Sequence, residues 1–377
     1  MVAANSLSLC YYTDVDTATK VITGKSLWAA NIAAMNDASE YRFGLETMRA
    51  LLNDRNASGA DPSMLDPATA VQEALDNLRL HMAPWYIICL SRQRDALNQW
   101  GFYAHEGGVC LELEFPPDVR FAASCARHDP LVELTPPGPP RQILYLRDDA
   151  LLKKADGSIP ALQEIEKRGL TVGKSDAILL KRDDFRLEDE WRLAFEVDEA
   201  TNRDLIRERT RFGACVPYLD VHLASGAPLP IVSVTVGPSR GQRRVFTSLR
   251  DFLDRLDSSQ TVACEPATYA ARWAQCLSEW QRLASLRQAS SVRPEDETTS
   301  TDEFIARCAV AQDDLTRLAT LITGADKTRA LHESFVTSHV NDLVTAYPDQ
   351  ADVANTCYVT RPGIIVWRSR IPYLFQG

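Results

Sequence analysis

The stretch FRLEDEWRLAFEV, residues 185–197, decides the fold because its second half alternates between apolar and charged side chains. From position 190 onward the large apolar residues are at odd-numbered positions and the charged residues are at even-numbered ones. The apolar residues are Trp191, Leu193, Phe195 and Val197, and the charged residues are Glu190, Arg192 and Glu196. Successive side chains of a strand point to opposite faces of its sheet, so this alternation predicts a strand with one apolar face. Glu188 has the parity of Glu190 and Arg192, which predicts that these three charged side chains share a face where the chain enters the sheet.

Further strands and amphipathic helices are predicted on both sides of this stretch. Alternating or continuous apolar runs bounded by turn residues predict strands over 8–13, 85–91, 108–115, 142–146, 215–223, 230–236 and 363–369. Helical periodicity predicts helices over 16–24, 36–55, 68–82 and 159–170. In the helix over 36–55, Tyr41, Leu45, Met48 and Leu52 recur at helical spacing, which predicts one buried face.

From about residue 242 the chain changes to helices, and one strand returns at the end. The helix over 268–286 carries an apolar stripe, which predicts a core: Tyr269, Trp273, Leu277, Trp280 and Ala284. We therefore predict an α+β protein, with a single mixed β-sheet domain, flanking helices and a C-terminal helical insertion before a returning last strand. The predicted parts are an α+β core over 1–257, a helical insertion or subdomain over 258–350, and the returning strand of the core over 351–377.

The composition is that of an ordinary globular protein. Of 377 residues 45% are hydrophobic and 24% are charged, and the formal net charge is -10. Non-specific attraction to nucleic acid is therefore not a property of the whole molecule, although a local basic patch can still bind a polyanion. The chain has nine cysteines without a C-x-x-C pair, and it has neither a long apolar run nor a basic, apolar leader at the N-terminus. These features predict a reduced, cytoplasmic protein that does not enter a membrane.

Several stretches, taken in order, resemble an uncharacterised bacterial family known as domain of unknown function 2971. The stretches are CYYT at 10–13, SLWAANIAAMNDASEYRFGL at 26–45, IICLSRQRDALNQWGFYAHEGGVCLELEF at 87–115, LEDEWRL at 187–193, VTVGP at 234–238 and SRIPY at 369–373. Together they span nearly the whole chain apart from the helical block. The family name carries no reaction.

A weaker resemblance to ADP-ribosyltransferases supplies one. In those enzymes an early strand bears a His or Arg, a middle strand bears a Ser, and a late E-x-E or Q-x-E turn supplies a catalytic Glu. The corresponding positions here are Tyr11 and Thr13, then Ser91, then Glu188 and Glu190. Tyr11 departs from the pattern, because a tyrosine hydroxyl cannot copy the bidentate charge of an arginine.

The resemblance implies NAD as co-substrate and no metal. A carboxylate that faces the ribose stabilises the oxocarbenium-like cation left when nicotinamide departs, and a second carboxylate orients or deprotonates the nucleophile. Glu190 is then the catalytic carboxylate, Glu188 its partner, and Arg192, on the same face, the third catalytic candidate. In this interpretation the turn before the strand exposes Glu188, and the start of the strand fixes Glu190. The candidates for the NAD pocket are Tyr11, Thr13, Asn36, Asp37, Ser91 and Tyr103.

Each of these signals also has a plain structural explanation. Glu188, Glu190 and Arg192 are equally consistent with a solvated strand face that carries a salt bridge. Asp37 and Glu40 have the spacing of a helix capping box, and Tyr103 can be buried beside Trp100 instead of stacking on a base or on nicotinamide. The arginines at 240, 243 and 244 form a basic loop before a helix, and a solvated role explains them equally well.

The sequence supports three functional hypotheses. The first is an ADP-ribosyltransferase-like, NAD-consuming bacterial effector, active in phage defence or toxicity, with a protein or nucleic acid as acceptor. The second is a non-catalytic binding or regulatory module that docks a protein partner through residues 258–350. The third is a metal-dependent nuclease in which Asp37, Glu40 and Glu190 converge, although six scattered histidines provide no metal-ligand spacing.

Overall fold

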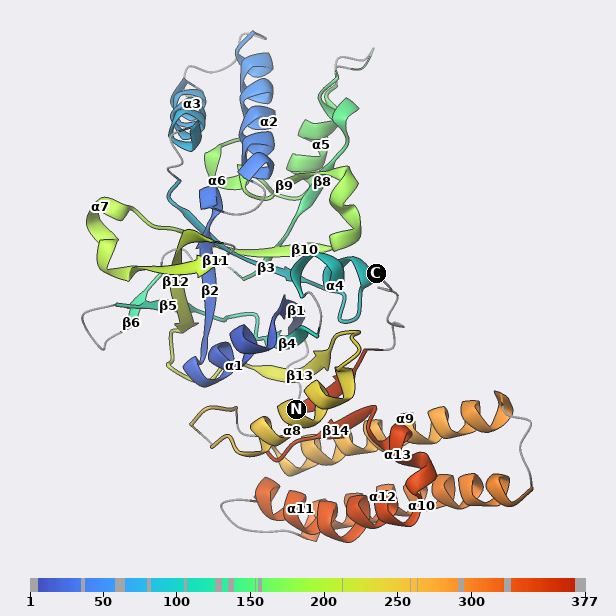
Figure 1. Cartoon of the computed structure of the whole chain (residues 1–377). Coiled ribbons are helices and arrows are strands. Elements are labelled where there is room, and N and C mark those ends of the chain that lie inside the picture. Colours follow the sequence, from blue (N-terminus) through green and yellow to red (C-terminus); the bar gives the residue numbers. More distant parts are fainter. Residues whose placement is uncertain are drawn as a thin grey trace. The chain divides into compact units, whose positions relative to one another are not determined.

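The structure is a computed structural model of the whole chain, drawn in Figure 1. It describes residues 6–34, 38–57, 65–79, 83–104, 107–125, 131–134, 139–152, 154, 158–211, 213–257, 259–262, 264–290, 295–321 and 327–369. Within these residues the protein is α+β, as predicted. Thirteen of the described strands belong to one mixed sheet, and two more form a separate parallel pair. None of the helices in the described ranges combines the length and the apolar character that a membrane crossing needs.

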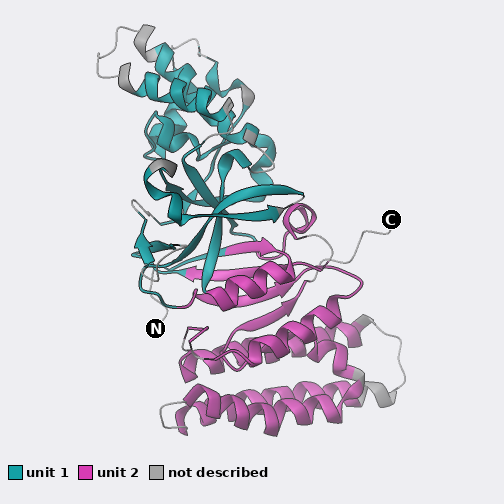
Figure 2. Cartoon of the chain, turned by 60° about the vertical axis from the view of Figure 1, so that its left-hand side comes forward, with its two compact units in different colours: residues 1–9, 25–93, 115–227 teal, residues 10–24, 94–114, 228–377 magenta. Residues whose placement is uncertain are grey.

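The chain divides into two compact units, which Figure 2 shows in teal and magenta. Unit 1 comprises residues 1–9, 25–93 and 115–227, and unit 2 comprises residues 10–24, 94–114 and 228–377. Strand β1, Leu7–Thr13, contributes residues to both. Each unit is described by itself below.

Unit 1 contains most of the sheet. Its strands are β2 Ser26–Asn31, β3 Trp85–Ser91, β5 Phe121–Ser124, β6 Leu131–Glu133, β7 Arg141–Gln142, β8 Leu144–Leu146, β9 Leu180–Arg182, β10 Glu190–Glu196, β11 Ile206–Arg211 and β12 Ala214–Leu223. Strand β3 pairs antiparallel with both β2 and β10, and β12 pairs antiparallel with β2, β5 and β11. Strands β8 and β9 form the separate parallel pair. The strand predicted over 142–146 is thus divided between β7 and β8.

The helices of unit 1 cover this sheet and supply its main core. They are η1 Ile32–Ala34, α2 Ala38–Ala57, α3 Leu65–Arg79, η3 Asp148–Leu151, α5 Pro160–Lys167, α6 Lys174–Ala177, η4 Asp183–Glu188, α7 Glu199–Asn202 and η5 Arg203–Leu205. The predicted apolar face of α2 is buried, and it packs with α3, α5, α6 and β8 in one hydrophobic cluster. Periodic apolar residues therefore decided which face of α2 turns inward.

Unit 2 holds the helical block and the strands that follow it. Its elements are α1 Val15–Gly24, α4 Leu97–Tyr103, β4 Val109–Phe115 (whose last residue belongs to unit 1), β13 Ile231–Val236, α8 Gln242–Asp254, α9 Pro266–Ser290, α10 Glu295–Leu321, α11 Lys327–Phe335, the π-helical turn η6 Val336–Val340, α12 Asn341–Ala346, η7 Pro348–Gln350, α13 Ala351–Ala354, β14 Cys357–Val359 and β15 Ile365–Arg368. Strand β13 pairs antiparallel with β4 and parallel with β15, and β14 pairs antiparallel with β15. The predicted return of the chain to the sheet is confirmed, with two strands in place of one.

The aromatic stripe of α9 forms the core of this block, as predicted. Its five residues are fully buried, and Figure 1 shows α9 and α10 side by side as the longest helices. Trp273 lies edge-on to Trp280, Phe335 and Tyr358, with ring centroids 6.1, 5.5 and 5.2 Å away. Residues of β14 and β15 belong to the same hydrophobic cluster. The helical block therefore shares its core with the returning strands.

At Gly44, helix α2 lies directly against the backbone of a neighbouring helix. A Cβ added there would lie far inside van der Waals contact with the backbone carbonyl oxygen of Ala177, in α6. A backbone oxygen cannot rotate away as a side chain can. Glycine is therefore required here because a larger side chain would clash with Ala177. The backbone conformation of Gly44 is helical and does not itself require glycine.

We expect Gly44→Ala to lower the free energy of unfolding by about 1–3 kcal/mol or more, because α2 and α6 must move apart. Urea denaturation followed by tryptophan fluorescence measures this. Gly101→Ala in α4 is the matched control, because nothing lies within 4 Å of a Cβ added there. That control should be neutral or stabilise by about 0.5–1 kcal/mol. Equal effects of the two substitutions would contradict the close approach of α2 and α6.

Candidate functional site

The acidic segment quoted at the start of the sequence analysis forms a tight turn between two elements of unit 1. Helix η4 ends at Glu188, Asp189 has left-handed backbone with φ 43° and ψ 52°, and β10 begins at Glu190. Glu188, Glu190 and Arg192 share a face, as predicted, but they are only 6%, 3% and 3% exposed. The expectation that the turn exposes Glu188 is therefore wrong, and so is the alternative of a solvated face, because other unit 1 elements cover these side chains.

A buried lysine lies at the centre of this face. Lys181 of β9 is 1% exposed, and its Nζ lies 2.7 Å from a carboxylate oxygen of Glu40, 2.7 Å from one of Glu188 and 3.0 Å from one of Glu190. An ammonium group has three N–H donors, and here each has its own carboxylate. Sequence reasoning missed Lys181, although it directly follows the apolar residues Leu179 and Leu180 in a short buried run.

Arg192 supplies the second cation of the cluster. Its Nε donates to Glu190 at 2.6 Å, its Nη2 donates to Glu40, and its Nη1 donates to the carbonyl oxygen of Ile178 at 2.6 Å. Glu40 belongs to α2, so this cluster joins that helix to a turn and a strand that lie about 150 positions further along the chain. The carboxylate of Glu40 thus binds two cations, whereas the predicted capping box cannot be assessed because Asp37 lies outside the described residues.

Three carboxylates face two cations in this buried site, and the pKa values of Glu188 and Glu190 are driven apart. Burial disfavours the ionised form of Glu190, but attraction from Arg192 and Lys181 outweighs it and lowers the pKa of that carboxyl to about 2. Burial raises the pKa of Glu188 above its usual range, although Lys181 acts in the opposite direction. Glu190 is therefore fixed as a carboxylate, and Glu188 is the member of the pair that holds a proton more readily.

Ser91 fixes the turn from the neighbouring strand. It is the cross-strand partner of Glu190 in the β3–β10 pair, so the structure places these two predicted residues side by side. The Ser91 hydroxyl donates to the carbonyl oxygen of Glu188 at 2.8 Å and accepts from the backbone N–H of Gln93 at 3.1 Å. The backbone N–H of Glu190 donates to the Tyr145 hydroxyl at 2.8 Å. Ser91 therefore holds the backbone of the acidic turn, and its hydroxyl is engaged there.

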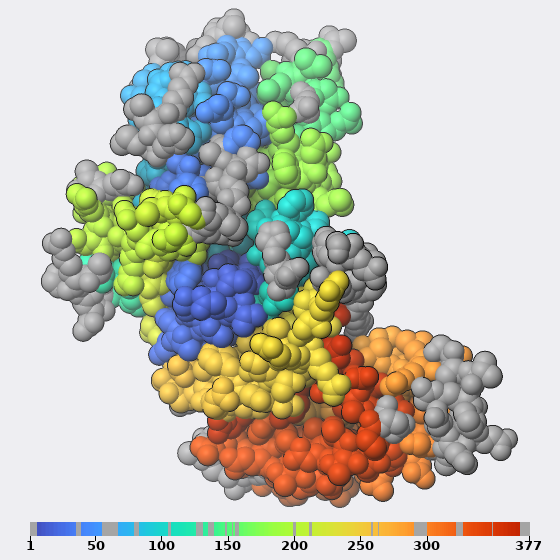
Figure 3. Space-filling model, viewed as in Figure 1, coloured from blue at the N-terminus to red at the C-terminus, as the bar shows by residue number. Residues whose placement is uncertain are grey.

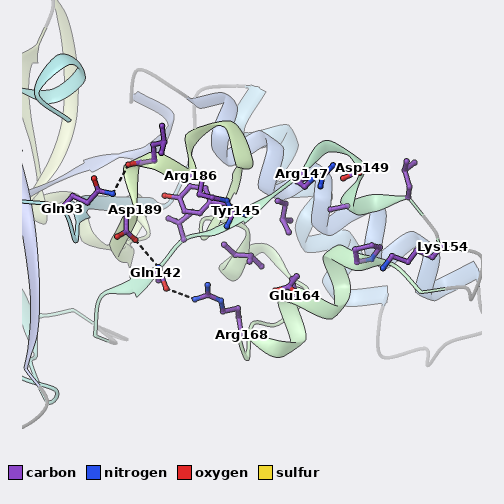
Figure 4. Close-up of a pocket in the computed structure, with 17 residues that line it drawn as sticks. Gln93, Gln142, Tyr145, Arg147, Asp149, Lys154, Glu164, Arg168, Arg186 and Asp189 are labelled. Carbon is purple, nitrogen blue, oxygen red and sulfur yellow. Dashed lines mark hydrogen bonds and ion pairs between the residues drawn. The ribbon is translucent and has the colours of Figure 1, made fainter. Parts of the chain in front are cut away.

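A pocket of about 970 Å³ lies beside this turn (Figure 4). Its polar and charged lining residues are Gln93, Gln142, Tyr145, Arg147, Asp149, Lys154, Glu164, Arg168, Arg186 and Asp189. The lining comes from the loop after β3, from β7 and β8, from η3 and α5, and from η4. Of the three acidic residues in the turn, Asp189 lines this pocket, while Glu188 and Glu190 point into the buried cluster.

A chain of hydrogen bonds crosses the pocket wall. Arg168 Nη1 donates to Gln142 Oε1 at 2.8 Å, and Gln142 Nε2 donates to Asp189 Oδ1 at 3.3 Å (Figure 4). A neutral amide thus separates the guanidinium from the carboxylate, so neither charge is neutralised by direct contact with the other. Arg186 lies with its guanidinium carbon 5.9 Å from the centre of the Tyr145 ring. The described wall therefore presents three carboxylates and four cations to the same cavity: Asp149, Glu164 and Asp189 with Arg147, Lys154, Arg168 and Arg186.

The remaining predicted site residues lie elsewhere in the chain. Tyr11, Thr13 and Tyr103 belong to unit 2, where Thr13 is buried, Tyr11 is half-buried and Tyr103 packs against the cluster around Trp100. The cluster and the pocket of unit 1 are described without them. Asn36 and Asp37 lie outside the described residues.

Two of the three carboxylates proposed for a nuclease do converge. Glu40 and Glu190 share Lys181 and Arg192 as partners, so protein cations occupy the space between their oxygens. Within the described ranges no group of three or more His, Cys, Asp or Glu residues has the arrangement of a metal site.

Comparison with known proteins gave no match: no family model, curated protein or solved structure is similar to this chain at a significant level.

We expect Glu190→Gln to reduce the free energy of unfolding at pH 7 by about 3–5 kcal/mol, because it leaves buried cations with too few carboxylates. The pKa of Glu190 is lower in the fold than in the unfolded chain. The stabilisation of the fold by ionised Glu190 is therefore complete above the pKa that this residue has in the unfolded chain. It is lost as the pH falls toward 2. The difference between wild type and variant should then narrow by roughly 3 kcal/mol between pH 5 and pH 2.

Urea denaturation at several pH values measures both effects. Glu196→Gln is the matched control on the same strand, because Glu196 is exposed and its ion pair with Lys174 at 3.4 Å is a surface pair. It should change stability by less than about 0.5 kcal/mol at every pH. A constant gap between wild type and Glu190→Gln across this pH range would contradict a stabilising ionised Glu190.

Proposed function

We propose that unit 1 binds NAD in the pocket beside the acidic turn, and that the protein is an ADP-ribosyltransferase-like, NAD-consuming enzyme. The observation that carries this proposal is the presence of a carboxylate and several cations on the walls of one cavity. NAD has the complementary distribution, with an anionic pyrophosphate and a positively charged nicotinamide ring.

The size and the charges of the pocket support a dinucleotide. Small-molecule sites have volumes of about 300–1,000 Å³, and this pocket of about 970 Å³ lies at the upper end of that range. Arg147 and Arg186 pair with Asp149 and Asp183. Lys154 and Arg168 are the lining cations best placed to bind the pyrophosphate. Arg168 is held by the neutral Gln142, which leaves its charge available to a ligand.

Asp189 is the carboxylate that would face the reacting ribose. In the reaction the bond between ribose C1′ and the nicotinamide nitrogen breaks, and its electron pair leaves with neutral nicotinamide. The cationic ribose is stabilised by the nearby carboxylate, and an acceptor nucleophile then bonds to C1′ and gives its proton to the same carboxylate. The sequence hypothesis gave this role to Glu190, but the ion pairs of Glu190 with Arg192 and Lys181 favour Asp189.

The buried cluster then has a positioning role. Lys181 and Arg192 hold Glu188 and Glu190, and these two residues flank Asp189 in the chain. Pinning both neighbours fixes the left-handed backbone at Asp189, which is an uncommon conformation for a residue other than glycine. A carboxylate held in this way needs little reorganisation when positive charge develops on the ribose.

A second candidate function is binding without turnover, as a regulatory module. The observation that favours it is that Glu188 and Glu190 already have protein cations as partners. In this case residues 258–350 would dock a protein partner, and the exposed apolar side chains of α9 and α10, Leu286, Val310 and Leu321, would contribute. The two functions differ in one measurement, because only the enzyme releases nicotinamide.

We expect the purified protein to bind NAD in isothermal titration calorimetry and to release nicotinamide, measured by chromatography. Asp189→Asn should lower the rate of release by about 100-fold or more with little effect on stability, because asparagine also tolerates left-handed backbone. Arg168→Ala should instead weaken NAD binding by about 10–100-fold, since it removes a charge-assisted contact to phosphate.

Asp184→Asn is the matched control for Asp189→Asn, because Asp184 is exposed in the same helical turn and does not line the pocket. Its rate of nicotinamide release should equal that of the wild type. NAD binding without any release of nicotinamide would support the regulatory module. The absence of NAD binding, or Asp189→Asn and Asp184→Asn with equal activity, would overturn the proposed enzyme.

A further inference from the structure

The exposed face of helix α8 in unit 2 forms a shallow hollow of about 770 Å³. Four arginines line it together with two hydroxyl side chains: Arg240, Arg243, Arg244 and Arg255 with Thr247 and Ser248. All four arginines are exposed. The yellow segment of Figure 3, which contains α8, lies at the surface in that view. The sequence predicts a loop at Arg243 and Arg244, but both belong to the first turn of α8.

The periodicity of α8 explains why these arginines gather on one side. Phe246, Leu249 and Leu253 are buried on the opposite face, at spacings of three and four residues. The side chains of Arg240 and Arg244 lie on the other side. Residues that follow them at helical spacing lie on that side too, so they point away from the core. The basic face is therefore fixed by the burial of the apolar face and does not depend on the arginines contacting one another.

The charge of the hollow is strongly positive. Asp251 is the one carboxylate among the described residues that line it, and Arg250, outside the lining, already binds that carboxylate at 2.8 Å. Arg243 pairs with Asp352 at 3.4 Å, but these side chains are 62% and 66% exposed. An exposed ion pair of this kind is weak and can exchange its partner for a stronger one. The face is thus basic within a chain of formal charge -10.

We infer that this face of α8 binds the phosphate backbone of a nucleic acid. Guanidinium groups bind phosphate oxygens through two parallel hydrogen bonds, and the hydroxyls of Thr247 and Ser248 are further donors to phosphate. The backbone N–H groups of the first turn of a helix add to the attraction for an anion. Contacts to phosphate fix the position of a nucleic acid but carry no sequence information, so we expect this binding to be independent of base sequence.

The extent of the basic face favours a polymer over a single phosphate. Arg240 and Arg255 are fifteen positions apart along α8 and its ends, which corresponds to about 22 Å at 1.5 Å per residue. That length is far greater than one phosphate group occupies, so several phosphates of a polymer can lie along it. A nucleic acid is one of the two acceptor classes expected from the sequence, but this inference stands without the NAD pocket, since its residues belong to unit 2 alone.

Fluorescence anisotropy with a labelled 20-base-pair DNA duplex of arbitrary sequence tests the inference. Neutralising about four phosphates predicts a slope of about -3.6 for the logarithm of the binding constant against the logarithm of salt concentration. Affinity should accordingly fall roughly a hundredfold between 50 and 200 mM salt. The double variant Arg243→Ala, Arg244→Ala should bind more weakly and make the slope shallower by about 2.

The matched control is the double variant Arg282→Ala, Arg317→Ala, which removes two exposed arginines from α9 and α10 outside the hollow. It should bind DNA with the affinity and the salt slope of the wild type. Circular dichroism melting of both double variants checks that each is folded. The inference is overturned by absence of DNA binding at 50 mM salt, by equal slopes for the two double variants, or by tighter binding of a polyglutamate peptide, which would indicate an acidic protein partner.

Discussion

The structure of unit 1 depends on one interaction, the ammonium group of Lys181 held by three carboxylates. Glu40 reaches it from α2, Glu188 from the end of η4 and Glu190 from the start of β10. Burying a charge is unfavourable unless its partners are in place, so these elements must assemble together for the cluster to be stable. Arg192 extends the constraint to the carbonyl oxygen of Ile178 and makes a second contact with Glu40. The acidic turn is therefore fixed from three sides.

A turn that is fixed in this way presents its middle residue outward. Glu188 and Glu190 point inward, and Asp189, in left-handed backbone between them, lines the pocket and accepts a hydrogen bond from Gln142. The carboxylate that is accessible to a ligand thus differs from the two that are essential to the cluster. Among three consecutive acidic residues, two are thus buried in the cluster and the third lines the pocket.

Charge is distributed unevenly over this protein. The chain as a whole is acidic, yet one pocket of unit 1 carries cations beside a carboxylate, and α8 of unit 2 presents a basic face. A local basic surface on an acidic molecule attracts a polyanion at short range and repels it elsewhere, which restricts where it can bind. The helical block that follows α8 shares its core with β14 and β15, so its long helices are anchored to the sheet.

The sequence by itself determined the α+β class, the faces of α2 and α9 that are buried, and the shared face of Glu188, Glu190 and Arg192. These features follow from periodicity, which is a local property of the chain. Only the tertiary structure decided that this face is buried, that Lys181 and Glu40 complete it, and that Asp189 lines the pocket. Glu40 and Arg192 are 152 positions apart, and an alternating run of charged residues looks the same whether water or another element covers it. Burial and long-range partners are set by packing, and packing is not encoded in any single stretch.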